Sequence, residues 1–197
     1  MTLPADTNDS ETFKRESWFR SYMEAYREAL FETDVTAELA SFRDLIVKTK
    51  NNGGKLIFAG NGASAAISSH AAVDFTKQCG TRSICFNEAD LITCFGNDYG
   101  YESWVKEALK AYADPEDCVV LISSSGSSPN VVEAGRHCRE HNLSLVTFTG
   151  FDPDNPLRQL GRVNLWLDSD SYNIVECTHM IWIMAVCDNL AATQPSN

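Results

Sequence analysis

The segment Val119-Val120-Leu121-Ile122-Ser123-Ser124-Ser125-Gly126-Ser127-Ser128 joins an apolar run to a turn rich in hydroxyl groups, and a helix-like stretch, residues 131–141, follows it. A strand that leads through such a turn into a helix brings backbone N–H groups, serine hydroxyls and the positive end of the helix dipole to one point, which suits a phosphate group. The turn has no lysine, unlike the GxxxxGK[ST] loop of nucleotide hydrolases, so it favours a singly phosphorylated small molecule over a nucleoside triphosphate. From this segment alone, a serine-rich surface loop that only caps a helix remains the alternative.

A second segment of the same kind occurs earlier in the chain. Residues 58–64, Phe-Ala-Gly-Asn-Gly-Ala-Ser, also pass from an apolar run through a glycine turn into a helical pattern. Asn61 and Ser64 offer side-chain donors near the start of that helix. Such a turn is common in α/β proteins, but two strand ends that converge on one anion are a much stronger signal than either alone.

Beyond Gly54 the sequence alternates between short apolar runs and helical patterns. The predicted strands are 56–59, 83–86, 118–122, 144–148 and 163–167, and the predicted helices are 63–79, 89–95, 102–113, 130–141 and 172–192. This alternation predicts an α/β fold with a parallel sheet covered by helices on both faces. Ligands of such sheets bind beyond the carboxyl ends of the strands.

The first part of the chain has a different pattern. Residues 1–11 are polar and expected to be frayed, and two amphipathic helices then follow, over 12–31 and from Asp34 to about Asn51. The predicted organisation is therefore a frayed N-terminus (1–11), a helical pair (12–52) and one α/β domain (53–192). The apolar stripes of the pair are broader than one small sheet requires, which indicates oligomerisation.

Composition and charge narrow the possible partners. The chain of 197 residues is 44% hydrophobic and 22% charged, as is ordinary for a globular protein. Its formal net charge of −11 argues against nucleic acid or an anionic membrane surface, because both need a basic face. No signal peptide or membrane span is expected, and seven cysteines without a disulfide or metal framework indicate a reduced, cytoplasmic protein.

Three motifs, in their order and spacing, resemble those of the SIS (sugar isomerase) domain, and within it those of the bacterial phosphoheptose (sedoheptulose 7-phosphate) isomerases: residues 60–64 (GNGAS), 96–100 (GNDYG) and 122–128 (ISSSGSS). The resemblance implies a three-layer sandwich with a five-stranded parallel sheet of the flavodoxin-like type, a homotetramer, and active sites at subunit boundaries. It also implies one set of sugar-phosphate-binding residues: Asn61, Gly62, Ser64, Asp98, Ser123, Ser124, Ser125, Ser128 and Asn173.

The reaction that this resemblance implies is aldose–ketose interconversion through an enediol, in which a base removes the proton next to the carbonyl and an acid serves the oxygens. The family's histidine and glutamate, one helical turn apart, correspond to His70 and Asp74, and Asp74 is the expected base. His70, Asp74 and Glu176, which stands where the family has a glutamine, are the expected ligands of zinc or another divalent metal. From spacing alone, an ordinary surface pair remains the alternative for His70 and Asp74.

Besides the substitutions at Asp74 and Glu176, a third position departs from the family pattern. Met184 stands where the family places the histidine that is read as general acid, and a methionine cannot donate a proton. His179 is the nearest substitute and the second candidate catalytic residue, although the family often has a histidine at this position too. His137 and His141, after the serine segment, are expected to face solvent.

Two functions therefore stay open. The first is an isomerase of a phosphorylated sugar. Its expected substrate is a heptose 7-phosphate used in nucleotide-heptose or lipopolysaccharide synthesis, and zinc is a candidate cofactor. An epimerase is compatible with the same enediol chemistry. The second is a non-catalytic SIS module that binds a sugar phosphate or serves as an oligomeric scaffold, like a relative that associates with the replication initiator.

Overall fold

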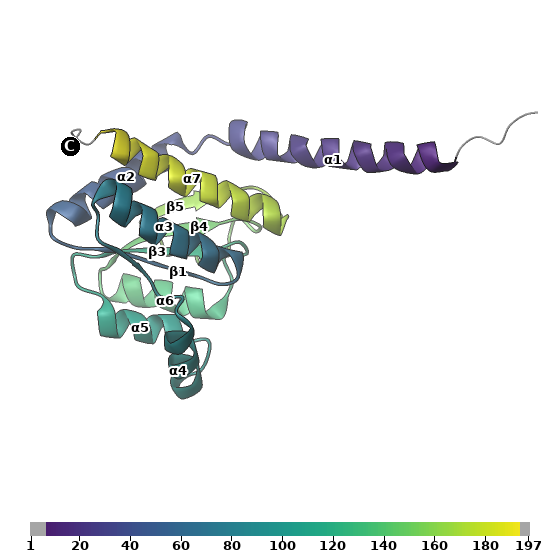
Figure 1. The fold of residues 1–197 in the computed structure, drawn as a ribbon. Helices are drawn as coiled ribbons and strands as arrows, with labels where there is room; N and C mark the ends of the chain where they lie inside the picture. The colour runs from purple at the N-terminus through teal and green to yellow at the C-terminus, as the bar shows by residue number, and fades with distance from the viewer. Residues whose placement is uncertain (1–6, 194–197) are drawn as a thin grey trace, which may run out of the picture. The chain divides into compact units, whose positions relative to one another are not determined.

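The computed structural model describes residues 7–193, with side-chain environments from residue 11 onward. The chain divides into two compact units, residues 1–34 and residues 35–197. The second unit is an α/β sandwich, and Figure 1 shows its sheet between two layers of helices.

The first unit is built on one long helix, α1 (Thr7–Phe31). Residues 7–11, which were expected to be frayed, are helical, while residues 1–6 lie outside the described part of the chain. Trp18 stacks on Tyr22 at a centroid distance of 5.1 Å, yet Trp18 and Met23 remain 59% and 63% exposed. An exposed apolar stripe is what a helix that packs against another copy would show, so oligomerisation through α1 stays a prediction.

The sheet is parallel throughout, with the strand order β2-β1-β3-β4-β5. Its strands are β1 (Leu56–Gly60), β2 (Ser83–Cys85), β3 (Cys118–Ser123), β4 (Ser144–Thr149) and β5 (Val163–Trp166). Every residue of β1 and β3 is buried, because parallel strands in the middle of such a sheet are covered on both faces. The five-stranded parallel sheet and the three-layer architecture expected from the resemblance are confirmed.

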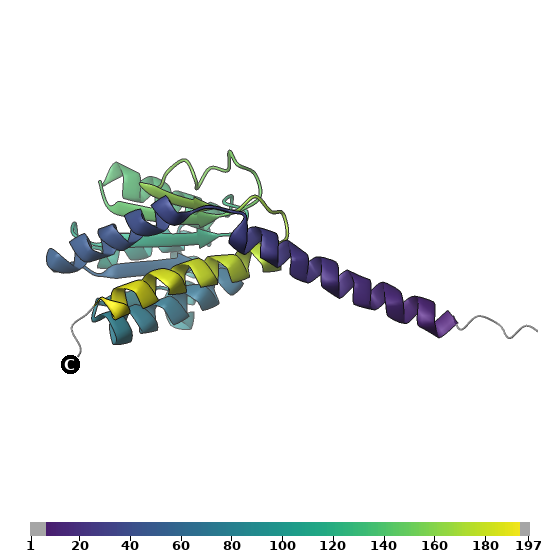
Figure 2. The same cartoon turned by 90° about the horizontal axis from the view of Figure 1, so that it is seen from above.

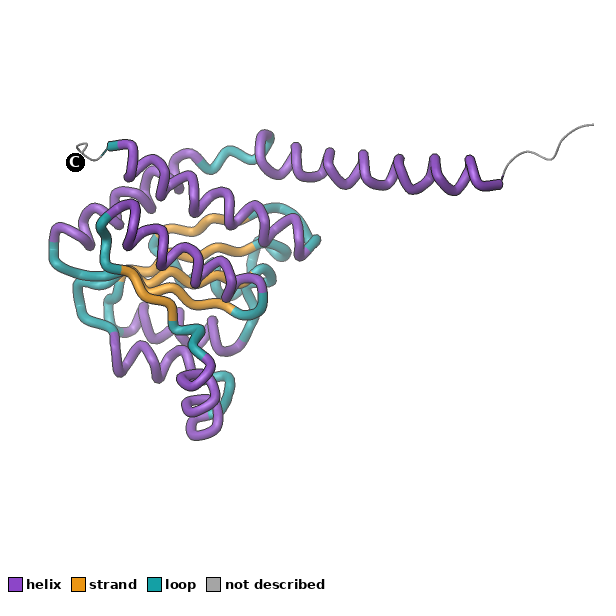
Figure 3. The backbone as a smooth tube through the Cα atoms, viewed as in Figure 1, coloured by secondary structure: helices purple, strands orange, loops and turns teal. Residues whose placement is uncertain are grey.

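Helices cover the two faces of the sheet in two groups (Figures 1 and 2). On one face lie α2 (Thr36–Asn51), α3 (Ala63–Cys79) and α7 (Tyr172–Ala192). On the other lie α5 (Trp104–Tyr112) and α6 (Pro129–Glu140), with α4 (Ala89–Tyr99) packed against α5. Figure 3 shows the strands between these layers, with loops and turns at the two ends of the strands.

Helix α2 belongs to the α/β unit. It packs against α7 and against the edge strand β5, and Phe42 on its buried face meets Phe75 and Phe148 at centroid distances of 6.3 and 5.7 Å. The boundary between the units therefore falls after Asp34, whereas the sequence pattern placed it after residue 52. A shared amphipathic pattern made α1 and α2 look like a pair, but it does not state what each helix packs against.

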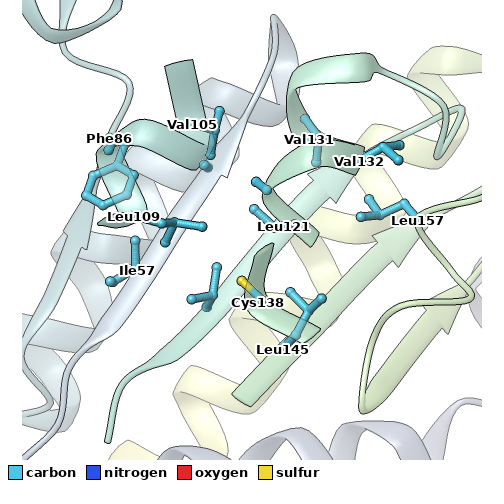
Figure 4. Close-up of a cluster of buried hydrophobic side chains, with 14 of the residues drawn as sticks. Ile57, Phe86, Val105, Leu109, Leu121, Val131, Val132, Cys138, Leu145 and Leu157 are labelled. Carbon is cyan, nitrogen blue, oxygen red and sulfur yellow. The ribbon is translucent and has the colours of Figure 1, made fainter. Parts of the chain in front are cut away.

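The core on the α5 and α6 side is a single apolar cluster (Figure 4). Strand residues Ile57, Leu121 and Leu145 meet helix residues Leu109 and Val131 there, and each of the five is at most 2% exposed. Fully burying a side chain of this size contributes about 1.5–3 kcal/mol. This packing holds β1 and β3 rigidly, and with them the turns that leave their ends.

Helix α7 is long and apolar enough to cross a membrane by length and composition. Half of that segment is buried, and the helix packs along α3 inside the α/β unit. A buried core helix passes the same test, so its apolar character is explained by the packing.

Candidate functional site

The strand order places the functional turns side by side. In the order β2-β1-β3-β4-β5, the chain reverses its direction of winding between β1 and β3, and α/β proteins bind ligands at such a switch point, beyond the carboxyl ends of the strands. Gly60, the last residue of β1, is paired with Ile122 of β3. The two glycine- and serine-rich turns predicted to act together therefore leave the sheet next to each other.

The first turn leads from β1 into α3 and needs its glycines. Gly62 has φ +57°, and a Cβ on Gly60 would lie 2.7 Å from Cβ of Ser64 and 2.9 Å from the carbonyl oxygen of Ile122. The side chain of Asn87, just beyond β2, fixes this turn, because its amide donates to the Gly60 carbonyl at 2.8 Å and its oxygen accepts the Gly60 N–H at 3.3 Å.

The serine turn, residues 124–128, leads from β3 into α6. Gly126 has φ +63°, donates its N–H to the Ser123 carbonyl at 2.9 Å and accepts the N–H of Leu157 at 3.0 Å. The buried Asn155 carboxamide lies against Gly126 so closely that a Cβ there would overlap it. The turn is thus held from behind by the segment that follows β4.

Replacing Gly126 by alanine is expected to lower the free energy of unfolding by about 2 kcal/mol, because the new Cβ adds overlap with Asn155 to the strain of a positive φ. Gly53→Ala is the matched control, since Gly53 has φ +78° with open space around it, and its cost should be about 1 kcal/mol. Urea unfolding of both variants measures the difference. Equal costs would show that Asn155 does not constrain the turn.

The two turns present an arrangement suited to an anion. Gly62 and Ser128 are the N-cap residues of α3 and α6, and neither helix end is capped by a side-chain hydrogen bond. The first N–H groups of a helix carry partial positive charge and bind phosphate readily. Hydroxyl groups surround this point: Ser123 donates to Ser128 at 3.3 Å, and Ser127 donates to Ser125 at 3.0 Å.

Burial differs among the serines predicted to bind substrate. Ser64, Ser123 and Ser124 are 3%, 5% and 5% exposed, whereas Ser125 and Ser128 are half-buried. The structure therefore places Ser125 and Ser128 at the accessible rim, and the other three hydroxyls behind it.

An amide pair joins the two turns. Asn61 and Asn130 exchange hydrogen bonds through their side chains, both at 2.9 Å, and Tyr101 donates its hydroxyl to Oδ1 of Asn61 at 3.0 Å. The side chain of Asn61, predicted as a direct phosphate ligand, is thus already paired and orients the first turn against α6. Asn130, Tyr101 and Asn87 were not predicted, although the position of Asn87 beyond a third strand end was a usable signal.

The serine turn also contacts the last helix. Ser124 donates its hydroxyl to Oε1 of Glu176 in α7 at 3.3 Å. Glu176, predicted as a metal ligand in place of a glutamine, is half-buried and lies directly beside the proposed phosphate site. Met184, two turns further along α7, is also half-buried.

His70 and Asp74 form the pair that their spacing predicts. Nε2 of His70 lies 3.4 Å from Oδ2 of Asp74 on α3, and the two side chains are 53% and 18% exposed. Within residues 7–193 of a single chain, no three His, Cys, Asp or Glu side chains are grouped to hold a metal ion. In the described part of one chain, His70 and Asp74 are therefore not grouped with a third such ligand, and the metal remains a prediction.

Two predicted substrate contacts lie on helices. Asp98, expected in a turn, is an exposed residue in the last turn of α4, where its Oδ1 accepts a hydrogen bond from Asn97 at 2.9 Å. Asn173, expected just before the last helix, lies in the first turn of α7 and is exposed.

His179 occupies an interior position. It is 0% exposed, and its Nε2 lies 3.1 Å from the carbonyl oxygen of Thr149, at the end of β4. Burial lowers its pKa to about 4. The ring points from α7 into the sheet, so its position argues against the predicted role as general acid and favours a structural one.

Comparison with known proteins identifies the family of the chain. The chain matches the SIS domain family over residues 18–150. It is 32% identical over 163 residues to a phosphoheptose isomerase of Geobacter sulfurreducens, covering 80% of this chain and 86% of that protein. A probable phosphoheptose isomerase of Thermoplasma volcanium is also 32% identical, over 173 residues that cover 84% and 87%.

A solved structure shows the same fold. The phosphoheptose isomerase from Neisseria gonorrhoeae superposes with a TM-score of 0.81 at 26% identity, covering 91% of this chain and 98% of that one. Fold, ordered motifs and sequence identity all lead to one assignment: the chain belongs to the SIS (sugar isomerase) domain family.

Proposed function

We propose that this protein is an aldose–ketose isomerase of a phosphorylated sugar, with sedoheptulose 7-phosphate as the substrate to test first. The observation that carries the proposal is the pair of helix N-termini without side-chain caps, joined by Asn61 and Asn130 at the switch point of the sheet. The proteins to which this chain is similar are named phosphoheptose isomerases, and this name states a phosphorylated heptose as their substrate. The rim serines Ser125 and Ser128 would bind that phosphate.

The reaction requires a base for the proton on carbon and a group that moves a proton between the two enediol oxygens. Asp74 would take the proton from the carbon next to the carbonyl and return it to the neighbouring carbon, while a proton moves between the two oxygens of the enediol. His70, 3.4 Å from Asp74, would hold the carboxylate in place. Glu176 would be oriented by its hydrogen bond from Ser124.

A divalent metal suits the donor set. One imidazole and two carboxylates, from His70, Asp74 and Glu176, are ligands that zinc accepts. A metal bound there would polarise the substrate oxygens as a Lewis acid. In the described part of one chain, His70 and Asp74 are not grouped with a third such ligand, so we propose that a neighbouring subunit of a homotetramer completes the metal site. The exposed apolar stripe of α1 supports the formation of an oligomer.

The cellular setting follows from the substrate. We propose a cytoplasmic enzyme that supplies heptose phosphate for nucleotide-heptose or lipopolysaccharide synthesis. Neither nucleic acid nor a membrane surface is expected as a partner, because the chain carries a formal net charge of −11.

Incubation of the full-length chain with sedoheptulose 7-phosphate, followed by NMR with and without added Zn²⁺, tests the proposal. New aldose phosphate signals are expected. The absence of turnover of any five- to seven-carbon ketose phosphate, together with stabilisation of the protein by these compounds, would replace it with the non-catalytic binding function.

A further inference from the structure

A pocket of about 370 Å³ lies at the amino-terminal ends of the strands, whereas the serine turn lies at their carboxyl-terminal ends. It is lined by the carboxyl-terminal ends of α5 and α6 and by Leu143, which directly precedes β4. Leu109, Ala113 and Leu143 supply apolar walls, and His137 and His141 supply two imidazoles. Because the serine turn follows β3 at its carboxyl end, this pocket is separate from the sugar-phosphate site.

The two histidines differ in exposure. The expectation that both face solvent is wrong for His137, which is 7% exposed, whereas His141 is exposed. Their rings lie together, with centroids 4.0 Å apart and planes inclined by 35°. The helical spacing of four residues brings one ring over the other at the end of α6.

The hydrogen bond of His141 determines which nitrogen is free. Its Nδ1 lies 3.0 Å from the carbonyl oxygen of His137. A carbonyl oxygen only accepts, so Nδ1 is the donor, and in the neutral form of the ring Nε2 has a free lone pair. Histidines that bind metal ions are held in this way, with the other ring nitrogen donating to a carbonyl or carboxylate.

The surroundings of His137 disfavour its protonated form. Burial lowers its pKa, and the neighbouring His141 and Lys110 lower it further, whereas Glu140 and Glu107 act in the opposite direction. Lys110 is paired with Glu107 at 2.8 Å, which offsets its charge beside the pocket. Two imidazoles in one pocket are suited to a metal ion, which binds the unprotonated ring nitrogens, whereas an anion would need protonated rings.

We propose that His137 and His141 form a two-imidazole site for an exchangeable divalent transition ion of the Zn²⁺, Ni²⁺ and Cu²⁺ class, with water completing the coordination. Structural zinc sites use four protein ligands, so a site with two histidines binds reversibly. It shares no ligand with His70, Asp74 or Glu176, and it stands whether or not the protein is an isomerase.

Metal titration of full-length, chelator-treated His70→Ala protein tests this site apart from the candidate catalytic pair. Calorimetry with Zn²⁺ should show one equivalent bound, and His141→Ala in the same background should weaken this binding at least about tenfold, the loss seen when even an outer partner of a metal ligand is removed. With Cu²⁺, electron paramagnetic resonance should show coupling to two nitrogens, and to one after His141→Ala.

Lys110→Ala is the matched control, because Lys110 lines the pocket without being a ligand. It should keep the bound equivalent, and the melting temperature without metal verifies that each variant is folded. His141→Gln serves as a second variant if His141→Ala is unstable. Lack of Zn²⁺ binding by His70→Ala protein, or equal affinity after loss of His141, would overturn the proposal.

Discussion

Asp74→Asn is expected to lower kcat for sedoheptulose 7-phosphate by about 100-fold or more, the range typical of a lost general base. Asparagine has nearly the same shape, but it cannot accept a proton at neutral pH. Because the proposed phosphate ligands are Ser125 and Ser128 rather than Asp74, KM should change much less than kcat. Initial rates at several substrate concentrations, measured by NMR, separate the two effects.

Two further variants sharpen this test. Asp44→Asn makes the same chemical change at an exposed carboxylate of α2 and should leave the rate unchanged. Asp74→Glu restores the family's residue and should keep activity well above that of Asp74→Asn. Wild-type kcat in Asp74→Asn would exclude Asp74 as the base, whereas a rise in KM alone would move its role to substrate binding.

The regular elements were largely predictable because each rests on a local pattern. The predicted helix over 63–79 has the observed bounds of α3, and the predicted strand over 118–122 is one residue short of β3. The helix predicted over 89–95 was too short, because Gly96 and Asn97 favour turns while the observed α4 continues to Tyr99. The next residue, Gly100, is the C-cap of α4 and has a φ of +84°.

The candidate site was predictable only in part. The two turns and the His70–Asp74 pair arise from residues near each other in sequence, so the motifs located them. The Asn61–Asn130 pair spans 69 residues, and the link from Ser124 to Glu176 spans 52. Such pairings depend on how strands and helices come together, which spacing along one chain does not encode.

The sequence also did not predict which side chains of α7 face the candidate site. Glu176 and His179 are three residues apart, so spacing alone placed both near the site. The structure separates them, because Glu176 meets Ser124 while His179 turns into the sheet toward Thr149. A helix that is apolar over most of its surface gives no clear sequence signal for which side faces the ligand.

The interior position of His179 makes the stability of the domain depend on pH. Its pKa is about 4 in the folded chain, against an ordinary value of 6.5. Between these values the unfolded chain binds a proton that the folded chain does not, so the free energy of unfolding falls as the pH is lowered from 6.5 to 4. The expected loss from this residue is about 3 kcal/mol, at 1.36 kcal/mol for each pH unit.

Replacement of His179 by glutamine isolates this contribution. The glutamine amide can still donate to the Thr149 carbonyl, but it takes up no proton in this range. Urea unfolding at several pH values should show that the stability difference between wild type and His179→Gln shrinks, or changes sign, as the pH falls from 7 toward 4. Parallel curves for wild type and His179→Gln would mean that His179 binds its proton as readily in the folded as in the unfolded chain, and would reopen its candidacy as an acid.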